Sequence, residues 1–498
     1  MIFTPNLRIV HMIRTRPTPW LHRCGVALLV LIGLVLGSVP QVMGQTLRDS
    51  LHHEVLDNGL EVMVLPDHSV PITTIELTVR HGAFAESPEF DGLAHLYEHM
   101  FFKGNEVIPN QEAYMDRIRE LGMVFNGTTS TERVNYFFTL PAENLSEGLE
   151  FMYHATVSPL FDEDEFEREK SVVFGEADRS ESSPYHWLRK SVREMLWYEH
   201  PHRKSPLGDM DAVADATVDQ MRHIQEVYYV PNNSVLLIAG DVDIDQGMEL
   251  ARQHFGEWER GPDPFEVEPV PEHPPLDETR VSIVKEDVQI PTFQIAWQGP
   301  NVDDDPQATH AADVLTYILD QPGSAFQQRL VDSGIALNAS KSYVTQRHGG
   351  QSTATVRARP DTLRDALRVT LEEINRLGDP DYFSDEQLEA AKTILEVNEI
   401  YRRENTSSFS RILTFWWAVS GLDYYLDYID DLHAVTGEDI ARYVDDYLRD
   451  QPFALGLLIS EEHREQLGLT EEELQELIED IQRDIDAEET VTQAAEEL

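Results

Sequence analysis

Two histidines four residues apart constrain this chain more than any other feature. Residues 92–104 read Gly-Leu-Ala-His-Leu-Tyr-Glu-His-Met-Phe-Phe-Lys-Gly. On a helix, His95 and His99 stand one turn apart on the same face, so their imidazoles can share one metal ion, with Glu98 beside them to act on water. The spacing therefore predicts a helix that carries part of a metal site. The alternative is an amphipathic helix whose histidines merely lie near its core face.

A catalytic zinc site needs three protein ligands and an open position for water. The third ligand has to come from another element, and it should be a histidine or a carboxylate. Glu176 lies near the end of a helix expected over 163–177 with Asp162 as its N-cap, and Glu169 stands two turns earlier on the same face. The sequence alone also allows both glutamates to be solvated surface charges, because the chain is so acidic.

The length and charge of the chain exclude some classes of protein. A chain of 498 residues is too long for one ordinary core and indicates two or more domains. Its 90 acidic and 39 basic residues give a net charge of −51, which argues against nucleic acid and anionic membranes as partners. The acids are spread along the whole chain, so we favour an acidic, halophile-like shell suited to high salt over a preference for basic substrates.

The first 44 residues have the pattern of a secretory signal peptide. Arg8, Arg14, Arg16 and Arg23 precede an apolar run over 25–37 that is too short to span a bilayer comfortably, and cleavage is expected after Gly44. An uncleaved anchor is the alternative. The single cysteine falls in this segment. We therefore expect an exported protein, periplasmic or extracellular, without disulfides, thiol catalysis or stable membrane insertion.

The rest of the chain divides into two halves that look like weak repeats of one plan. We expect a metal-binding domain over 45–260, a Pro-rich acidic linker over 261–279, a second domain over 280–461 and an acidic helical tail over 462–498. In the second domain Gln298-Gly299 follows a strand much as His81-Gly82 does in the first. His310 and Tyr317 form no metal pair, so the second copy is predicted to have the scaffold without the ligands.

These motifs together resemble the pitrilysin–insulinase family of zinc peptidases, which are inverzincins and include the mitochondrial processing peptidases and their bacterial relatives. The family pattern is His-x-x-Glu-His followed by a distal Glu-x-x-x-x-x-x-Glu, which His95, Glu98, His99, Glu169 and Glu176 match in order and spacing. The resemblance covers roughly residues 50–460. Further matches lie at 102–104, 125–128, 135–136, 159–161, 229–234 and 240–242.

The resemblance implies a fold, a reaction and a set of site residues. The fold is α+β: two homologous domains, each a mostly antiparallel sheet with helices packed on one face, forming a clamshell. The activity is hydrolysis of peptides or unfolded segments by a zinc metalloendopeptidase, with zinc on His95, His99 and Glu176. Glu98 would accept the proton of water and deliver it to the leaving amine, and Glu169 would orient a ligand histidine.

Substrate contacts are expected on one strand of the first domain. In the family, a strand with an Asn-Ala-x-Thr-like segment pairs its edge with the peptide backbone, which suits unfolded peptides of many sequences. Phe125, Asn126, Gly127 and Thr128 occupy that segment here, and Tyr136 lies on the neighbouring strand. The competing interpretation is an ordinary internal strand with Asn126 in a turn.

The second half departs from the family pattern where relatives supply substrate contacts. They carry a phrase like Leu-Arg-Glu-x-x-Gly-Leu-Ala-Tyr, whereas this chain has Leu330 in place of the arginine and Leu337 in place of the tyrosine. Arg329 and Tyr343 are nearby but out of register. Our hypothesis is a heterodimer with a homologous, metal-free subunit that brings the Arg and Tyr. A self-sufficient monomer or homodimer with a diverged pocket is the alternative.

Two rival functions remain open. The chain could be a non-catalytic structural or assembly subunit, as some members of the family have become, or a zinc-dependent peptide-binding protein with negligible turnover. The intact set of His95, Glu98, His99 and Glu176 argues against the first rival, because such subunits tend to lose their ligands. Peptide digestion with and without a chelator separates the three functions.

Overall fold

The strands of the first half form one six-stranded sheet with the order β1-β2-β6-β3-β5-β4. The computed structural model describes residues 47–199 and 205–496, with side chains as far as 487, so the expected signal peptide lies outside the described residues. All neighbouring strands are antiparallel except β2 and β6. The strands are β1 (His52–Val55), β2 (Glu61–Pro66), β3 (Ile72–Val79), β4 (Val124–Thr129), β5 (Val134–Pro141) and β6 (Ser234–Gly240).

The second half repeats this arrangement in a five-stranded sheet, β7-β11-β8-β10-β9, in which only β7 and β11 are parallel. The order matches that of the first sheet without its β1 edge, so β8, β10 and β9 take the places of β3, β5 and β4. The predicted α+β fold with two homologous domains is therefore confirmed. The strands are β7 (Arg280–Lys285), β8 (Thr292–Gln298), β9 (Ala336–Val344), β10 (Gln351–Ala358) and β11 (Ala454–Ile459).

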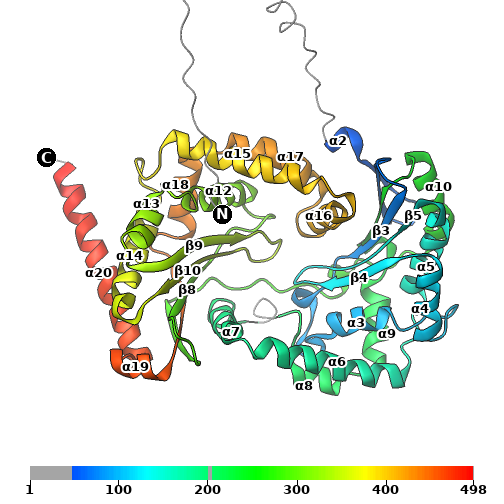
Figure 1. The fold of residues 1–498 in the computed structure, drawn as a ribbon, viewed down its shortest axis with the longest axis horizontal. Helices are drawn as coiled ribbons and strands as arrows, with labels where there is room; N and C mark the ends of the chain where they lie inside the picture. The colour runs from blue at the N-terminus through cyan, green and yellow to red at the C-terminus, as the bar shows by residue number, and fades with distance from the viewer. Residues whose placement is uncertain (1–46, 200–204, 497–498) are drawn as a thin grey trace, which may run out of the picture. The chain divides into compact units, whose positions relative to one another are not determined.

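Each sheet buries one face against helices of its own half (Figure 1). In the first half, Ile75 and Leu77 alternate with polar residues along β3, and together with Phe138 of β5 they join Tyr97 and Phe101 of α3 in the core. The helices of this half are α3 (Leu93–Phe101), α4 (Gln111–Glu120), α5 (Leu145–Val157), α6 (Glu163–Glu181), α8 (Met210–Asp215), α9 (Val218–Tyr228) and α10 (Ile244–Phe255).

The second core follows the same rule. Phe293, Ile295 and Trp297 of β8 pack against Leu315 and Ile318, which lie on α12. The helices of this half are α12 (Pro306–Leu319), α13 (Ala325–Gln327), α14 (Leu363–Arg376), α15 (Asp385–Arg402), α17 (Leu422–Ala434), α18 (Gly437–Tyr447) and α19 (Glu461–Leu467), and the chain ends in α20 (Glu471–Glu496). Leu474, Ile478 and Ile481 of α20 are buried in this core, because the helix packs on α14 and β7.

The two halves exchange one helix each. Helix α7 (Pro184–Leu196) follows the first half in sequence but packs on β7, β8 and β11 of the second sheet. It comes so close that a Cβ added at Gly456 would lie 2.6 Å from Val192. Helix α16 (Thr406–Val419) in turn packs on β3 and β6 of the first sheet. Residues 50–498, which contain both sheets, form one compact unit.

A buried polar joint holds α16 on the first sheet. Glu76 points to the face of β3 opposite the core, is fully buried, and accepts hydrogen bonds from Asn135 (2.7 Å) and from Thr414 of α16 (2.6 Å). Arg133 donates to Thr414 Oγ1 at 3.0 Å and to the carbonyl of Arg411 at 2.9 Å. Buried polar groups are costly unless paired, so these bonds fix where α16 lies.

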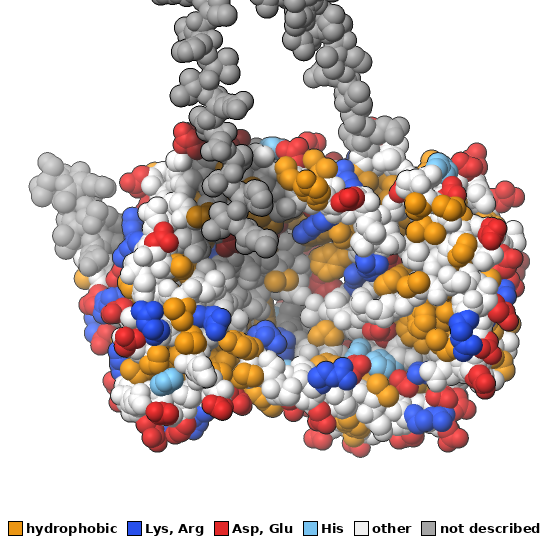
Figure 2. Space-filling view, viewed as in Figure 1, with side chains coloured by type: hydrophobic (Ala, Val, Ile, Leu, Met, Phe, Trp, Pro, Cys, Tyr) orange, Lys and Arg blue, Asp and Glu red, His pale blue; other side chains and the backbone are white. Residues whose placement is uncertain are grey.

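The segment between the domains contains one short helix, α11 (Pro264–Val267), capped by Asp263. Over the described residues, no helix is both long and apolar enough to cross a membrane. Acidic side chains are scattered over the outer surface of the visible face and do not form a single patch (Figure 2).

Candidate metal centre

Helix α3 carries both histidines, and its first turn is held from outside the helix. Gly92 precedes the helix with φ +97°, and it offers no side chain to cap the free N–H groups. The buried carboxylate of Glu86 does this instead, accepting from Gly92 N at 3.0 Å and from Ala94 N at 2.7 Å. A negative charge at a helix N-terminus is favourable, so Glu86 fixes the start of the helix at Leu93, two residues before His95.

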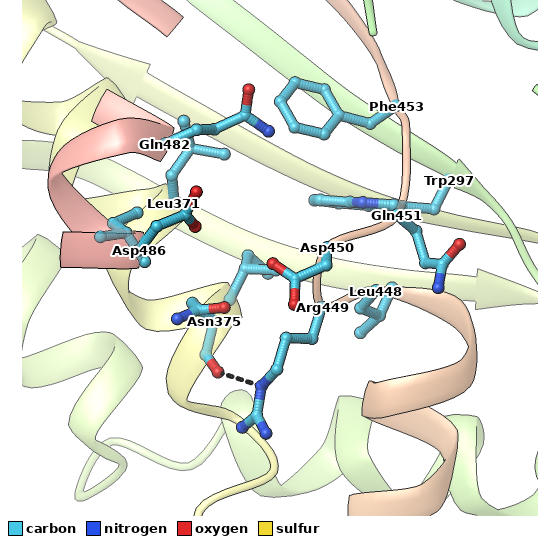
Figure 3. Close-up of a pocket in the computed structure, with 12 residues that line it drawn as sticks. Trp297, Leu371, Asn375, Leu448, Arg449, Asp450, Gln451, Phe453, Gln482 and Asp486 are labelled. Atoms are coloured by element: carbon cyan, nitrogen blue, oxygen red, sulfur yellow. Dashed lines mark hydrogen bonds between the residues drawn. The ribbon is translucent and has the colours of Figure 1, made fainter. Parts of the chain in front are cut away.

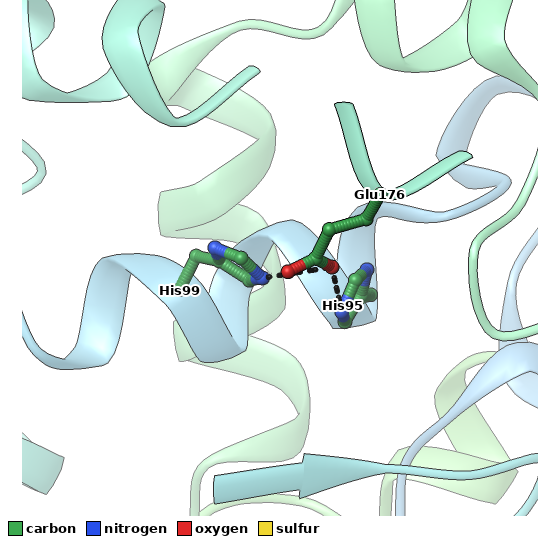
Figure 4. A group of neighbouring side chains, drawn as sticks. All are labelled: His95, His99 and Glu176. Atoms are coloured by element: carbon green, nitrogen blue, oxygen red, sulfur yellow. Dashed lines mark ion pairs between the residues drawn. The ribbon is translucent and has the colours of Figure 1, made fainter. Parts of the chain in front are cut away.

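Helix α6 packs against α3 and brings Glu176, the third candidate ligand, to the two histidines. Its N-cap is Asp162, as predicted, with the side chain accepting from Glu165 N at 3.0 Å. Glu176 Oε2 lies 3.5 Å from His95 Nε2 and 3.7 Å from His99 Nε2 (Figure 4). Within the described part of the chain this is the only group of three or more such side chains whose ligand atoms converge, all within 4.8 Å.

The residues fit a zinc ion. Two ligand atoms bound about 2.1 Å from one tetrahedral zinc are about 3.4 Å apart, close to both Nε2–Oε2 distances here. Burial, and then the neighbouring His99, lowers the pKa of His95 to about 4, so this imidazole is neutral and able to coordinate. Two histidines and a carboxylate leave a fourth position for water or substrate, the donor set of a catalytic zinc site.

His99 is oriented by a pair of charges behind it. Its Nδ1 lies 3.0 Å from Glu169 Oε2, and the other oxygen of Glu169 is 2.6 Å from Lys103 Nζ. Burial would raise the pKa of Glu169, but the hydrogen bonds from His99 and Lys103 outweigh it and hold the pKa below its ordinary value. An ionised Glu169 keeps the proton of His99 on Nδ1 and leaves Nε2 facing Glu176.

Glu98 projects to the neighbouring strand β4 and not toward Glu169. Thr129 donates a hydrogen bond to Glu98 Oε2 at 2.7 Å. A Cβ added at Gly127 would lie 2.8 Å from Glu98 Oε1, so only glycine leaves room for the carboxylate there. Burial raises the pKa of Glu98, although the hydrogen bond from Thr129 opposes it. A carboxylate with a raised pKa is suited to take up a proton near neutral pH.

Strand β4 lies at the edge of the sheet, beyond β5, so one side of its backbone has no strand partner. Phe125 is half-buried, Asn126 and Thr128 are exposed, and Gly127 is buried against Glu98. The strand is an edge strand, so the competing interpretation of an internal strand is wrong, and Asn126 is paired with Phe137 and is not in a turn.

The structure corrects the expectation for Tyr136. Its side chain is fully buried under α3, stacked on Phe101 with ring centroids 3.6 Å apart, and its hydroxyl is hydrogen-bonded to that of Tyr229 at 2.6 Å. Tyr136 therefore supports the helix from below and does not touch a peptide. The period-two alternation of β5 points it toward the core, which a sequence motif does not reveal.

The second half has the same frame with other side chains. Aligning the core-facing residues of α12 with those of α3 places Asp313 and Tyr317 opposite His95 and His99. Lys170 of α6 donates to the glutamate three residues before it and to a backbone carbonyl, and Lys392 of α15 makes the same two kinds of hydrogen bond, so these two lysines correspond. This match puts Asn398, which donates to Tyr317 at 3.3 Å, opposite Glu176. No metal ligand set is found there among the described residues.

The two residues that lie near the missing substrate contacts are already engaged. The guanidinium of Arg329 lies 2.5 Å from Glu373 and 2.7 Å from Glu372, and the Tyr343 hydroxyl donates to the carbonyl of Pro300 at 2.8 Å. Both side chains are thus bound to groups of the second half itself.

A separate cavity of about 440 Å³ lies in the second half, between α14, the end of α18 and α20 (Figure 3). Its walls include Trp297, Phe453 and Arg449. The Arg449 guanidinium is held by Asp379, Asp445 and the carbonyl of Asn375. None of the predicted site residues lines this cavity. Arg449 is the one basic residue among those that line it, and its charge is already paired with Asp379 and Asp445.

The comparisons with known proteins agree with this geometry. The family model described as "Insulinase (Peptidase family M16)" matches residues 62–209, and "Peptidase M16 inactive domain" matches residues 215–395. The first match contains His95, Glu98, His99 and Glu176 together. The chain belongs to the pitrilysin–insulinase family of peptidases. Its predicted membership is thereby confirmed.

Named relatives in the pitrilysin–insulinase family include bacterial zinc proteases. The chain is 25% identical to "Zinc protease PqqE" of Helicobacter pylori, over 83% of this chain and 95% of the relative. A solved protease from Helicobacter pylori has a TM-score of 0.73 at 22% identity, covering 82% of this chain and 99% of that one. The periplasmic protease PqqL from Escherichia coli has a TM-score of 0.71 at 19% identity, and 87% of this chain covers 50% of that one.

Sequence reasoning missed three residues of the site. Lys103 lies inside the matched Phe-Lys-Gly motif, and Thr129 directly follows the predicted substrate segment. The sequence therefore marked both positions but did not indicate what their side chains do. Glu86 carried none, because its contact with α3 depends on how residues 86–92 fold back.

Proposed function

We propose that this chain is an exported zinc metalloendopeptidase that hydrolyses peptides or unfolded protein segments. The observation that carries the proposal is the convergence of His95 Nε2, His99 Nε2 and a Glu176 oxygen, with Glu98 held beside them. Two further facts support it: a relative along most of the chain is named a zinc protease, and a fold relative is titled a periplasmic protease.

Each residue of the site has a separate role in the proposed hydrolysis. Zinc bound by His95, His99 and Glu176 would polarise a scissile carbonyl and acidify water. Glu98 Oε2 is engaged by Thr129, which leaves Oε1 to take the proton of the attacking water and pass it to the leaving amine. Glu169 holds His99 in the coordinating orientation.

The free edge of β4 would bind the substrate backbone as an added strand. Residues 125–128 lie directly beside Glu98, because Gly127 touches that carboxylate. A peptide paired with this edge is held through its amides and carbonyls, so its side chains are read weakly and unfolded segments of many sequences fit.

We also propose that a homologous, metal-free subunit supplies an arginine and a tyrosine to the substrate. Leu330 and Leu337 replace them in this chain, and Arg329 and Tyr343 are bound elsewhere. The match to PqqL covers 87% of this chain but only 50% of the PqqL chain, so PqqL has room for two units of this size, which supports such an arrangement. Full peptidase activity of the purified chain alone would favour a self-sufficient monomer or homodimer.

The decisive experiment compares the wild-type chain with Glu98→Gln. The wild type should cleave an unfolded peptide and lose that activity with a chelator, whereas Glu98→Gln should bind one zinc per chain and hydrolyse at least about 100-fold more slowly. Zinc content is measured by elemental analysis and cleavage by mass spectrometry. Glu120→Gln, an exposed glutamate on α4, is the matched control.

The outcomes separate the rival functions. Zinc and peptide binding without cleavage by the wild type would indicate a peptide-binding protein. A wild-type chain that binds neither zinc nor peptide would indicate a structural or assembly subunit. Full activity in Glu98→Gln would remove that carboxylate from the mechanism.

A further inference from the structure

A loop of the second half reaches the turn beside the metal centre. The loop connects β9 to β10, and the turn connects β4 to β5 in the first half. Glu132, in that turn, accepts hydrogen bonds from Arg347 N at 3.1 Å and from His348 N at 2.9 Å, one to each carboxylate oxygen. Gln346 Nε2 donates to Thr131 Oγ1 at 2.8 Å. Three consecutive residues of one half are thus bonded to two consecutive residues of the other.

Glu132 is an unusual residue to find at such a contact. It is 3% exposed, and none of the ion pairs within 4 Å among the described residues involves it. A buried carboxyl group that makes no ion pair within 4 Å is expensive unless hydrogen-bond donors satisfy it, and here each oxygen accepts from a backbone N–H of the other half. The contact is therefore specific: it is made only when residues 346–348 are in place.

The turn leads directly to the catalytic carboxylate. Thr129, three residues before Glu132, donates the 2.7 Å hydrogen bond to Glu98. The same turn also binds the segment before α3, since Ser130 and Thr131 carbonyls accept from Ala83 N and Phe84 N at 3.3 and 2.9 Å. That segment ends in Glu86, the cap of α3. His348 closes the contact by stacking on Phe84, with centroids 5.2 Å apart.

We propose that residues 346–348 of the second half position Glu98 through Glu132, which orders the β4–β5 turn that holds the catalytic carboxylate. Glu132 is a positioning residue: it contacts neither the metal ligands nor Glu98. The role of Glu98 rests on the proposed peptidase function, but the ordering of the turn does not. The second half then contributes to catalysis without supplying a metal ligand.

The first test measures order without measuring activity. In Glu132→Gln, the side-chain NH2 group replaces one carboxylate oxygen and cannot accept a hydrogen bond from the backbone N–H that faces it. The turn should then be less well held, so amide hydrogen exchange should become faster in peptides covering 82–94 and 124–135. Exchange in residues 471–480 should stay as in the wild type, as should all exchange in the Glu120→Gln control. Unchanged exchange in both site segments of Glu132→Gln would overturn the proposal.

The second test asks whether Glu132 acts through Thr129. Thr129→Val and Glu132→Gln should each lower kcat by about 10- to 100-fold with little change in KM or zinc content. The double variant should be little worse than the poorer single variant, because both changes release the same carboxylate. Multiplicative losses would overturn the proposal, as would a kcat unchanged in Glu132→Gln.

A variant that disturbs the contact less than Glu132→Gln keeps the proposal testable if Glu132→Gln fails to fold. Gln346→Met removes the bond to Thr131 and leaves the buried carboxylate untouched, and it should shift exchange and kcat in the same direction by less. If the wild type shows no chelator-sensitive cleavage, the proposed function fails, and hydrogen exchange alone decides whether the second half orders the turn.

Discussion

Gly127 and Glu98 form a contact that explains why a glycine interrupts an otherwise bulky strand. The space that a Cβ would occupy at Gly127 is taken by the Glu98 carboxyl group, whose Oε1 would be 2.8 Å away. The clash is with the flexible end of a side chain, so a methyl group would move the carboxylate and leave the backbone in place. Such a displacement costs little stability but moves the group that we propose transfers the proton.

Gly127→Ala should therefore lower kcat by about 10- to 100-fold while the chain keeps its zinc and its melting temperature. Steady-state cleavage of a peptide and thermal unfolding measure the two effects. Gly437→Ala is the matched control, because a Cβ there meets nothing within 4 Å and should leave kcat unchanged. A Gly127→Ala chain with wild-type kcat would show that Glu98 tolerates displacement.

Helix α3 needs an outside cap because its own N-cap position is a glycine. Gly92 has φ +97° and lies against Gly208, so no residue with a side chain fits there without strain. Glu86 supplies the missing acceptors and a negative charge at the positive end of the helix dipole. Since His95 sits in the first turn, fraying of this end moves a proposed metal ligand.

Glu86→Ala should lower the free energy of unfolding by about 0.5–2 kcal/mol, the usual range for loss of an N-cap, and should weaken zinc binding. Thermal unfolding in a chelator isolates the first effect, and competition with a fluorescent zinc indicator measures the second. Glu89→Ala, an exposed glutamate of the same segment, should change neither. If Glu86→Ala bound zinc as tightly as the wild type, the Glu86 cap would contribute to the stability of the fold but not to zinc binding.

The two halves share one frame, but where the first half has the candidate metal ligands the second has ionisable groups of another kind. The strand registers place Lys341 of β9 where β4 has Gly127, and α12 has Asp313 where α3 has His95. Lys341 is 2% exposed and donates to Tyr443 at 3.1 Å and Ser352 at 3.3 Å. Lys341 thus occupies the strand position that Gly127 leaves open to Glu98 in the first half.

The buried Lys341 predicts how the stability of the whole chain depends on pH. Burial lowers its pKa to about 7, although Asp313 opposes the shift. The unfolded chain keeps this proton up to about pH 10.5, so between pH 7 and 10 unfolding takes up a proton and the free energy of unfolding rises with pH. The rise from this group is at most about 1.4 kcal/mol per pH unit.

Lys341→Met should remove this contribution. Urea unfolding at pH 7, 8 and 9 should show the stability difference between wild type and variant widening in favour of the wild type as the pH rises. Lys285→Met, an exposed lysine, should follow the wild-type slope. Parallel slopes for wild type and Lys341→Met would mean that Lys341 stays protonated in the folded chain.

The sequence by itself determined the plan of the fold and one element of the site. The spacing of His95 and His99 predicts one helix face, and alternating apolar residues predict the strands, because both periods are local properties of the backbone. The distal pair Glu169 and Glu176 followed from a family resemblance, since residues alone left them as surface charges. The α+β class of the two domains came from the same source, whereas their number followed from the chain length and the repeated halves.

Only the tertiary structure decided what surrounds those side chains. It brought Glu176 to the two imidazoles, turned Tyr136 into the core, and joined His348 to Glu132 across 216 positions of the sequence. The exchange of α7 and α16 between the halves also has no local signal. Such contacts depend on which faces meet when both sheets are packed, and the periodicity of a single segment carries no information about its distant partner.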